Sequence, residues 1–222
     1  MKSSTEYIFW QLADTSFPTG GFAHSSGLES GWRHGLVQRE NIHDFCHDLI
    51  RQVSMQTGPF VDAASQNPSR IWSLDSLYHV MCANHVARRA SILQGGAMLL
   101  AAQRAFGLEA LKSLQESHCT GEFNGHFGPV FGAVCGLVHI EPLAAVRLLL
   151  FGTVRQTLSA AVRLGIMGSL ESLPMLHAMT NLMDQAAESA LNRLPEHAAM
   201  ACPLVDICQS SHDRLYSRLF QS

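Results

Sequence analysis

Residues 142–164 read PLAAVRLLLFGTVRQTLSAAVRL, which is the most apolar stretch of the chain. Proline is well tolerated in the first turn of a helix, so Pro142 predicts that a helix begins there. Apolar side chains follow at helical spacing and predict a buried face, formed by Ala145, Leu148, Leu149 and Leu158. Only short apolar runs remain between the three arginines, Arg147, Arg155 and Arg163. The stretch therefore predicts a packed helix of a globular protein and not a membrane span.

Helical periodicity extends over most of the remaining chain. Asn41, with Asp44 three residues later, predicts the N-terminus of a second helix. Ser73 predicts the start of a third helix, interrupted or bent near Gly95, and Pro174 predicts the first position of a fourth. No segment has the strict alternation of polar and apolar residues that is typical of a half-buried strand. The sequence therefore predicts a single all-α domain, a bundle of about nine or ten helices.

The composition bounds the function classes. The chain of 222 residues is 47% hydrophobic but only 15% charged, against about 25% charged in an average globular protein. So much apolar surface excludes a disordered polymer, and a surface poor in charge predicts an oligomer or a complex. The net charge of −3 gives no overall basic field, so binding to nucleic acid is not expected. All but two of the 15 basic residues are arginine, which suits interfaces, although a biased genomic composition explains this equally well.

The cysteines and the first residues of the chain indicate the cellular compartment of the protein. None of the six cysteines forms a C-x-x-C pair, so a thiolate zinc site is not indicated. The first residues, MKSSTEY, lack the apolar core of a signal peptide. We therefore expect reduced, mostly buried cysteines in a cytoplasmic protein without a membrane segment.

Two segments match known enzyme motifs only in part. Gly107 and the pair Lys112-Ser113 resemble the end of a phosphate-binding loop, but leucine stands at position 111, where such a loop needs glycine. Ala23-His-Ser-Ser-Gly27 is close to the strained turn that exposes a catalytic serine, but it lacks the first glycine and the preceding strand. We expect no catalytic residue and no bound cofactor. The alternative is a helical hydrolase that uses Ser25 or Ser26.

Histidines are the stronger candidates for site chemistry. His43 and His47 stand four residues apart, so both imidazoles project from one face of the helix that Asn41 begins. Imidazole binds nickel, copper and zinc. The alternative is a hydrated first turn, in which Asp44 and Asp48 complement the helix dipole. Two ligands on one helix hold a metal weakly unless others converge, so both histidines are weak metal candidates and no site is assigned.

Two further segments combine turn residues with large apolar side chains. Phe17-Pro-Thr-Gly20 fits a type I turn and lies between Trp10 and Phe22. Residues 126–132, HFGPVFG, join two helical stretches through small residues that permit close contact between helices. A turn packed on the core accounts for either segment alone. The alternative is that the first segment faces a partner, with the candidate residues Phe17, Pro18, Gly20 and Gly21.

Four blocks, taken in order, resemble the family of F-type urease accessory proteins (UreF). They are residues 11–29 (QLADTSFPTGGFAHSSGLE), 126–132 (HFGPVFG), 160–165 (AAVRLG) and 211–222 (SHDRLYSRLFQS). The first and last blocks are long and specific, and the four are spread over nearly the whole chain. The chain departs from the family pattern at Asp213, where glutamate is usual, and at Ser169 and Leu173, where proline and glutamine are common.

The resemblance implies an all-α fold, a homodimer and no catalysis by the chain itself. Members of the family bind the UreD/UreH-type accessory protein and the UreG-type GTPase, and the complex delivers nickel to apo-urease. The competing hypothesis is a nickel carrier that binds the metal in its own right through His43 and His47.

Residues 210–222 are a candidate partner-binding tail that follows a core of residues 1–209. Ser210 and Asp213 predict a capped helix with an apolar stripe and with Arg214 and Arg218 on another face. A helix this short is below the roughly 12–15 residues of marginal stability in water, so it must dock or stay disordered. It docks either on its own core or on a partner, and the resemblance favours a partner. The candidate partner-binding residues are His212, Arg214, Leu215, Tyr216, Arg218, Leu219 and Phe220.

Overall fold

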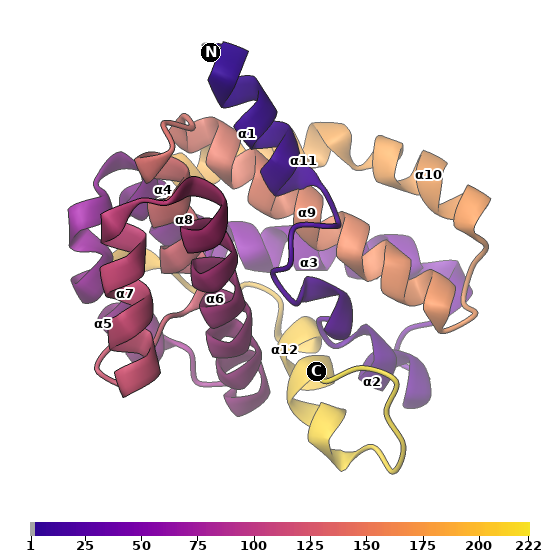
Figure 1. Ribbon diagram of the computed structural model, residues 1–222. Helices are drawn as coiled ribbons and strands as arrows, with labels where there is room; N and C mark the ends of the chain where they lie inside the picture. The colour runs from indigo at the N-terminus through magenta and orange to yellow at the C-terminus, as the bar shows by residue number, and fades with distance from the viewer. Residues whose placement is uncertain (1–2) are drawn as a thin grey trace.

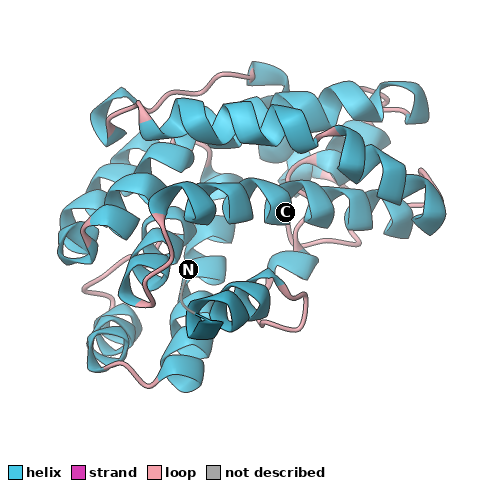
Figure 2. Cartoon of the chain, turned by 90° about the horizontal axis from the view of Figure 1, so that it is seen from above, coloured by secondary structure: helices cyan, strands magenta, loops and turns pink. Residues whose placement is uncertain are grey.

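The computed structural model describes residues 3–222, which form helices joined by loops (Figures 1 and 2). This range contains twelve α-helices and no strand, so the predicted all-α class is confirmed with a helix number slightly above the predicted one. The first six α-helices are α1 Ser3–Ala13, α2 Leu28–Arg33, α3 Ile42–Gln56, α4 Gly58–Gln66, α5 Ile71–Met81 and α6 His85–Phe106. The other six are α7 Glu109–Thr120, α8 Phe127–Leu137, α9 Pro142–Arg163, α10 Ser169–Ala178, α11 Thr180–Leu191 and α12 Pro203–Ser210. Short 3-10 turns lie at η1 Gly21–Ala23, η2 Arg39–Asn41, η3 Pro68–Arg70, η4 Pro195–His197 and η5 Ser211–Arg214.

Helix α9 runs through the middle of the molecule and contacts α3, α4, α8, α10 and α11 (Figure 1). It begins at Pro142, as the sequence predicts. The predicted face is buried, namely Ala145, Leu148, Leu149 and Leu158. Arg147 lies at its margin and forms an ion pair with Asp184, with 2.8 Å between Nε and Oδ1. No helix within residues 3–222 is long and apolar enough to cross a bilayer.

Helix α8 lies against α4 with almost no side chain between the two backbones. A Cβ atom at Gly132 would lie 2.5 Å from the carbonyl oxygen of Val61, and one at Gly136 would lie 2.4 Å from that of Ser65. Both distances are far below van der Waals contact, so only glycine fits at these positions. The close helix contact predicted from the small residues of this segment is confirmed.

The predicted bend near Gly95 is wrong, because α6 runs through it without a break. A Cβ atom at Gly95 would lie 1.8 Å from the carbonyl oxygen of Gly125, so this glycine lets the loop before α8 lie directly on α6. The helix predicted from Ser73 is instead two helices, α5 and α6. The break lies at residues 82–84, where the Asn84 side chain accepts hydrogen bonds from the amides of Val86 and Ala87 at 3.0 and 3.2 Å.

Two other predicted helix starts differ in detail. Asn41 does precede α3, but its Oδ1 accepts a hydrogen bond from the Gln38 amide at 2.6 Å and therefore caps the preceding 3-10 turn. Pro174 is not a first helical residue, because it lies inside α10. That helix begins earlier, where the Glu171 side chain accepts a hydrogen bond from the Gly168 amide at 2.7 Å. A carboxylate cap thus sets the helix start before the proline is reached.

The tail, residues 210–222, is not the predicted amphipathic helix. Ser210 is the last residue of α12, only η5 is helical after it, and the remaining residues run without regular secondary structure beside α2 (Figure 1, yellow). The helix prediction is wrong because the tail amides find other acceptors, which are described with the candidate site.

Substitution of Gly95 by alanine should destabilise the protein by at least about 2 kcal/mol, because the new methyl group meets a backbone carbonyl that cannot move aside. Gly152→Ala in α9 is the matched control. No atom lies within 4 Å of its added Cβ, so it should stabilise the fold by about 0.5–1 kcal/mol. Urea unfolding of both variants measures the two effects, and equal stabilities would contradict the packing role of Gly95.

Candidate functional site

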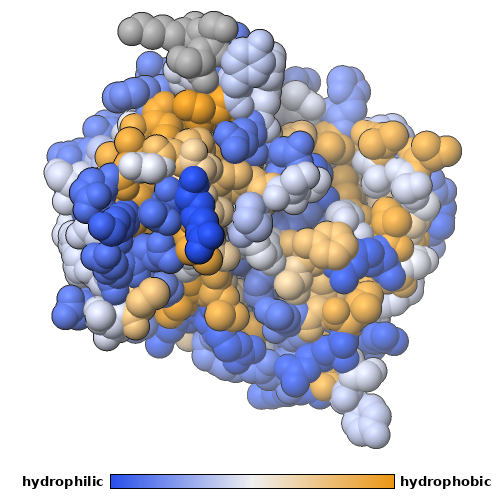
Figure 3. Space-filling model, in the orientation of Figure 1, coloured by the Kyte–Doolittle hydropathy of each residue, from blue (hydrophilic) through white to orange (hydrophobic). Residues whose placement is uncertain are grey.

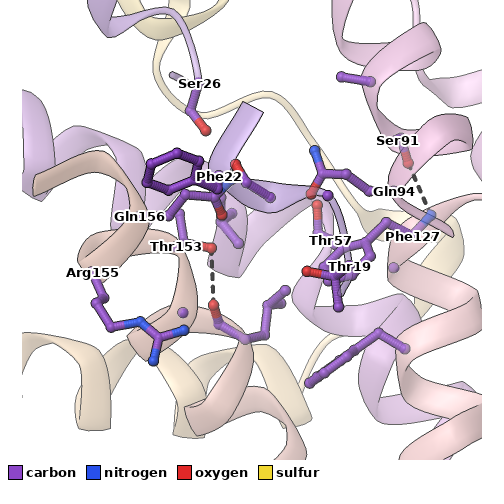
Figure 4. A pocket seen from close by; sticks show the side chains of 18 of the residues that line it. Thr19, Phe22, Ser26, Thr57, Ser91, Gln94, Phe127, Thr153, Arg155 and Gln156 are labelled. Atoms are coloured by element: carbon purple, nitrogen blue, oxygen red, sulfur yellow. Dashed lines mark hydrogen bonds between the residues drawn. The ribbon is translucent and has the colours of Figure 1, made fainter. Parts of the chain in front are cut away.

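The loop between α1 and α2, residues 14–22 and here called the strap, forms one wall of a cavity of about 530 Å³ (Figure 4). Helices α3, α6, α8, α9 and α12 form the other walls, together with Tyr78 of α5. Figure 4 shows uncharged polar side chains beside apolar ones around this space, among them Thr19, Thr57, Gln94, Phe127 and Gln156. Residues from the first three of the four sequence blocks thus surround one cavity.

Helix α9 fixes both ends of the strap through its side chains. Arg155 donates a hydrogen bond to the carbonyl of Ala13, just before the strap, and Gln156 donates one to the carbonyl of Gly21. Arg163, one of the arginines that interrupt the apolar stretch, donates to the carbonyl of Phe22 at 2.6 Å. The polar residues of α9 that face this loop therefore bind backbone carbonyls at both of its ends.

The predicted partner-facing turn divides into inward and outward residues. Phe17 and Gly21 are buried, whereas Pro18 and Gly20 are exposed. The turn is tighter than predicted, because the Thr19 amide donates to the carbonyl of Phe17 at 2.8 Å. Gly20 has φ +72°, a conformation that favours glycine. Only Pro18 and Gly20 of the four candidate residues are therefore available at the surface.

The buried carboxylate of Glu29 in α2 holds the tail. Its Oε1 accepts a hydrogen bond from the Leu219 amide at 2.7 Å, and its Oε2 accepts one from the Phe220 amide at 3.0 Å. The Nε2 atom of His212 lies 3.2 Å from the same Oε2. Hydrogen bonds to a charged group contribute about 1.5–3 kcal/mol each, so these contacts replace the helical bonds that the tail amides lack.

The last residues also pair with the chain between the strap and α2. The Gln221 amide donates to the carbonyl of Ala23 at 2.7 Å, and the Ser25 amide donates to the carbonyl of Ser222 at 2.6 Å. The ring Nδ1 of His24 lies 2.6 Å from the hydroxyl of Ser222. Burial, followed by the nearby charges of His212 and Arg89, lowers the pKa of His24 to about 4, so its ring is neutral at pH 7.

Arg163 connects α9, the strap and the tail at a single point. Its guanidinium lies 3.9 Å from the centre of the Phe22 ring and 4.3 Å from the centre of the Phe220 ring. Cation–π contacts of this kind contribute roughly 0.5–2 kcal/mol each. The first, third and fourth sequence blocks therefore meet at this arginine, although they are far apart in the chain.

The outer side of the tail is polar and aromatic. Arg214, Tyr216, Arg218 and Leu219 are exposed, Leu215 is half-buried, and His212 and Phe220 are buried in the core. The tail candidates thus divide between partner-accessible residues and residues that anchor the segment.

Ion pairs fix the base of this surface. Asp213 accepts two hydrogen bonds from Arg89, at 2.8 and 3.1 Å, and one from Arg218 at 3.0 Å. These bonds hold the pKa of Asp213 below its usual range, and the bonds from Arg89 have the largest effect. Asp213 thus connects the tail to α6.

The second sequence block has a structural centre at His126, which precedes α8. Its backbone amide donates to Asp75 at 2.7 Å, and its ring nitrogens lie 3.0 Å from Nδ1 of His79 and 3.2 Å from the hydroxyl of Ser91. Burial, then the neighbouring His79 and Arg88, lowers the pKa of His126 to about 4. These contacts place Phe127 in the wall of the cavity.

The fold does not bring the candidate metal ligands, His43 and His47, and the candidate nucleophile Ser25 together at one site. On α3, His43 is exposed and His47 is half-buried, and the ring Nδ1 of each lies 3.6 and 4.0 Å from the carboxylate of the next residue, Asp44 and Asp48 respectively. In the described part of the chain, no group of three or more His, Cys, Asp or Glu side chains is arranged to hold a metal ion. The Ser25 hydroxyl is buried, donates to the carbonyl of Ser222 and accepts from the amide of Glu29. It therefore serves to hold the tail.

Replacement of Glu29 by glutamine should release the tail. One acceptor oxygen becomes an NH₂ group, which repels the amide donors of Leu219 or Phe220. Trypsin cleavage after Arg214 and Arg218, followed by mass spectrometry, should become about tenfold faster. Glu109→Gln is the matched control, because that carboxylate is 86% exposed in the side chain. Equal cleavage rates in wild type and Glu29→Gln would show that this carboxylate does not hold the tail.

The two histidines with lowered pKa values predict that stability falls in acid. Both are neutral in the folded chain down to about pH 4, whereas in the unfolded chain they bind protons below about pH 6.5. The unfolded state therefore binds more protons between these pH values, and the free energy of unfolding falls as pH decreases through this window. We expect a loss of about 1–2 kcal/mol for each histidine at pH 5 in urea unfolding.

Single substitutions test whether His24 and His126 cause the loss of stability in acid. His24→Asn and His126→Asn should each reduce the loss of stability between pH 7 and pH 5, whereas His43→Asn, at an exposed position, should not. A wild-type stability that stays constant from pH 7 to pH 5 would contradict the assigned pKa values.

Comparison with known proteins agrees with the family that the four blocks resemble. The UreF family model matches residues 36–180. A urease accessory protein F of Arabidopsis thaliana is 34% identical over 227 residues, covering 100% of this chain and 94% of the relative. The protein of the same name from Oryza sativa subsp. indica is also 34% identical, covering 99% and 86%. A urease accessory protein UreF of Trichodesmium erythraeum is 28% identical, covering 98% and 97%. A match of this extent means that the chain belongs to the UreF family of urease accessory proteins.

Proposed function

We propose that this chain is a non-catalytic, cytoplasmic scaffold in urease maturation. It joins the UreD/UreH-type accessory protein and the UreG-type GTPase, and the complex inserts nickel into apo-urease in a GTP-dependent step. The family membership supports a role in urease maturation. The observation that carries the scaffold role is the outer side of the tail, an exposed surface on a backbone that is already fixed.

The composition of this surface favours protein binding. Tyr216 is fully exposed, and Arg214 and Arg218 lie close to it in the sequence. Tyrosine and arginine are the residue types enriched in binding hot spots. Because the tail backbone is held by Glu29 before any partner arrives, a partner does not have to supply the cost of ordering it. We assign this surface to the GTPase.

A second surface, formed by the apolar residues of α10, supports a homodimer or a contact with the UreD/UreH-type protein. None of the residues of α10 is buried, and Leu170 and Leu173 are 81% and 61% exposed. Figure 3 shows apolar residues gathered where Figure 1 places α10. Met175 and Leu176 of this helix pack against the core, but exposed apolar side chains such as Leu170 and Leu173 are typical of a surface that another chain covers.

The GTPase assignment is tested by substitution on the outer side of the tail. Tyr216→Ala and Arg218→Ala should weaken recruitment of the UreG-type GTPase by about 1–3 kcal/mol each, while the contact with the UreD/UreH-type protein persists. Co-purification of the tagged chain with both partners, followed by native mass measurement, gives the composition of the complex. Arg104→Ala, an exposed arginine at the end of α6, is the matched control. Full GTPase recruitment by both tail variants would refute the assignment.

A further inference from the structure

The cavity beside the strap has the size and the mixed lining of a site for a small molecule. Its volume of about 530 Å³ lies within the roughly 300–1,000 Å³ that is typical of such sites. Apolar side chains from three helices form part of its wall, among them Leu49 of α3, Phe131 of α8 and Leu148 of α9. A molecule with an apolar body therefore removes apolar surface from water when it enters this cavity.

Two polar side chains at the cavity keep their hydrogen-bonding groups free. Among the described residues, neither the Gln94 carboxamide nor the Thr19 hydroxyl is hydrogen-bonded to another group of the protein, and both side chains are half-buried. Figure 4 shows them on the same side of the cavity as Thr57, whose hydroxyl already lies 3.1 Å from that of Tyr78. Gln94 and Thr19 therefore offer donors and acceptors to a molecule in the cavity.

The charged side chains at the cavity are engaged with the protein itself. Asp14 and Asp206 each accept a hydrogen bond, at 2.6 and 3.0 Å. Arg155 and Arg163 each donate to a backbone carbonyl. Burial raises the pKa of Cys82 to about 11, so its thiol is uncharged at pH 7. The hydrogen-bonding capacity that remains for a ligand is therefore mainly uncharged.

We propose that this cavity binds a small, uncharged organic molecule that carries an amide group on an apolar body. A carboxamide presents an acceptor and a donor side by side, so the free carboxamide of Gln94 is able to form two hydrogen bonds with a second amide. The hydroxyl of Thr19 is available for a third bond, and the apolar walls accommodate the rest of the ligand. The site belongs to the free chain and does not rest on the proposed function.

Two substitutions test the amide contact and the space separately. Gln94→Leu keeps the approximate size of the side chain and removes its carboxamide. Gly152 of α9 lines the cavity, and no atom lies within 4 Å of a Cβ atom added there, so Gly152→Leu fills space without a backbone clash. Gln103→Leu is the matched control, because Gln103 is a half-buried glutamine of the same helix as Gln94 and is not among the residues that line the cavity. Urea unfolding checks that each variant is folded, and Gln94→Leu tests the proposal even if Gly152→Leu is not.

The experiment titrates the free, full-length chain with benzamide, an uncharged amide on an aromatic ring, and follows binding by saturation-transfer difference NMR. Wild type and Gln103→Leu should bind benzamide saturably, with a Kd on the order of 1 mM for a ligand of this size. Gln94→Leu should weaken binding by about tenfold, because the ligand amide loses its partner. Gly152→Leu should abolish binding. Benzoate has the same shape but a negative charge, and it should bind at least about tenfold more weakly than benzamide.

The contrary outcomes are distinct from one another. Absence of saturable benzamide binding by the wild-type chain would overturn the site. Equal affinity of wild type and a folded Gly152→Leu would also overturn it, because the ligand would then bind outside the cavity. Equal affinity of wild type and Gln94→Leu, or of benzamide and benzoate, would contradict the assigned ligand chemistry. None of these results bears on the GTPase assignment, because none of the substituted residues lies in the tail.

Discussion

A buried carboxylate without hydrogen-bond donors is among the costliest defects that a folded chain can have, on the order of several kcal/mol. Glu29 is such a carboxylate, and its donors are the amides of Leu219 and Phe220 and the ring of His212. Because all of them come from the tail, the first and last parts of the sequence have to meet for either to be stable. The tail is therefore a structural part of the core at its inner side and a free surface at its outer side.

Residues of the four sequence blocks hold together segments of the chain that are far apart in the sequence. Phe220, from the fourth block, contacts both Glu29 of the first block and Arg163 of the third, and Arg163 also contacts Phe22 of the strap. The second block places the loop before α8 on α6 through His126 and Asp75. Several polar side chains of these blocks, among them Glu29, Arg163 and Ser25, bind backbone amides or carbonyls.

Local signals in the sequence predicted the parts of the fold that depend on local physics. The apolar periodicity and the proline predicted α9, and the small residues of the second block predicted the contact of α8 with a neighbouring helix. The prediction for Gly95 was wrong because this glycine contacts Gly125, which is remote in the sequence, and the prediction for Pro174 was wrong because the carboxylate of Glu171 caps the helix before the proline. A glycine that bends a helix and one that admits another backbone look alike in a sequence.

The candidate site was predicted only in part for the same reason. The helical pattern of the tail is real, but amides that bind Glu29 cannot also bond the preceding turn of a helix. Glu29, Arg163 and Asp75 were not predicted as site residues, since a glutamate early in a helix or an arginine between apolar residues is ordinary at a solvated surface. Glu29 and its partner Leu219, and Arg163 and its partner Phe22, are more than a hundred residues apart in the sequence. No local sequence pattern therefore indicates these contacts.

Amide hydrogen exchange of the free wild-type chain tests the central claim most directly. If Glu29 makes the tail part of the core, the amides of Leu219 and Phe220 exchange about as slowly as amides in the middle of α9, without any partner present. Exchange of these two amides at the rate of an unstructured peptide, beside a protected α9, would contradict the account.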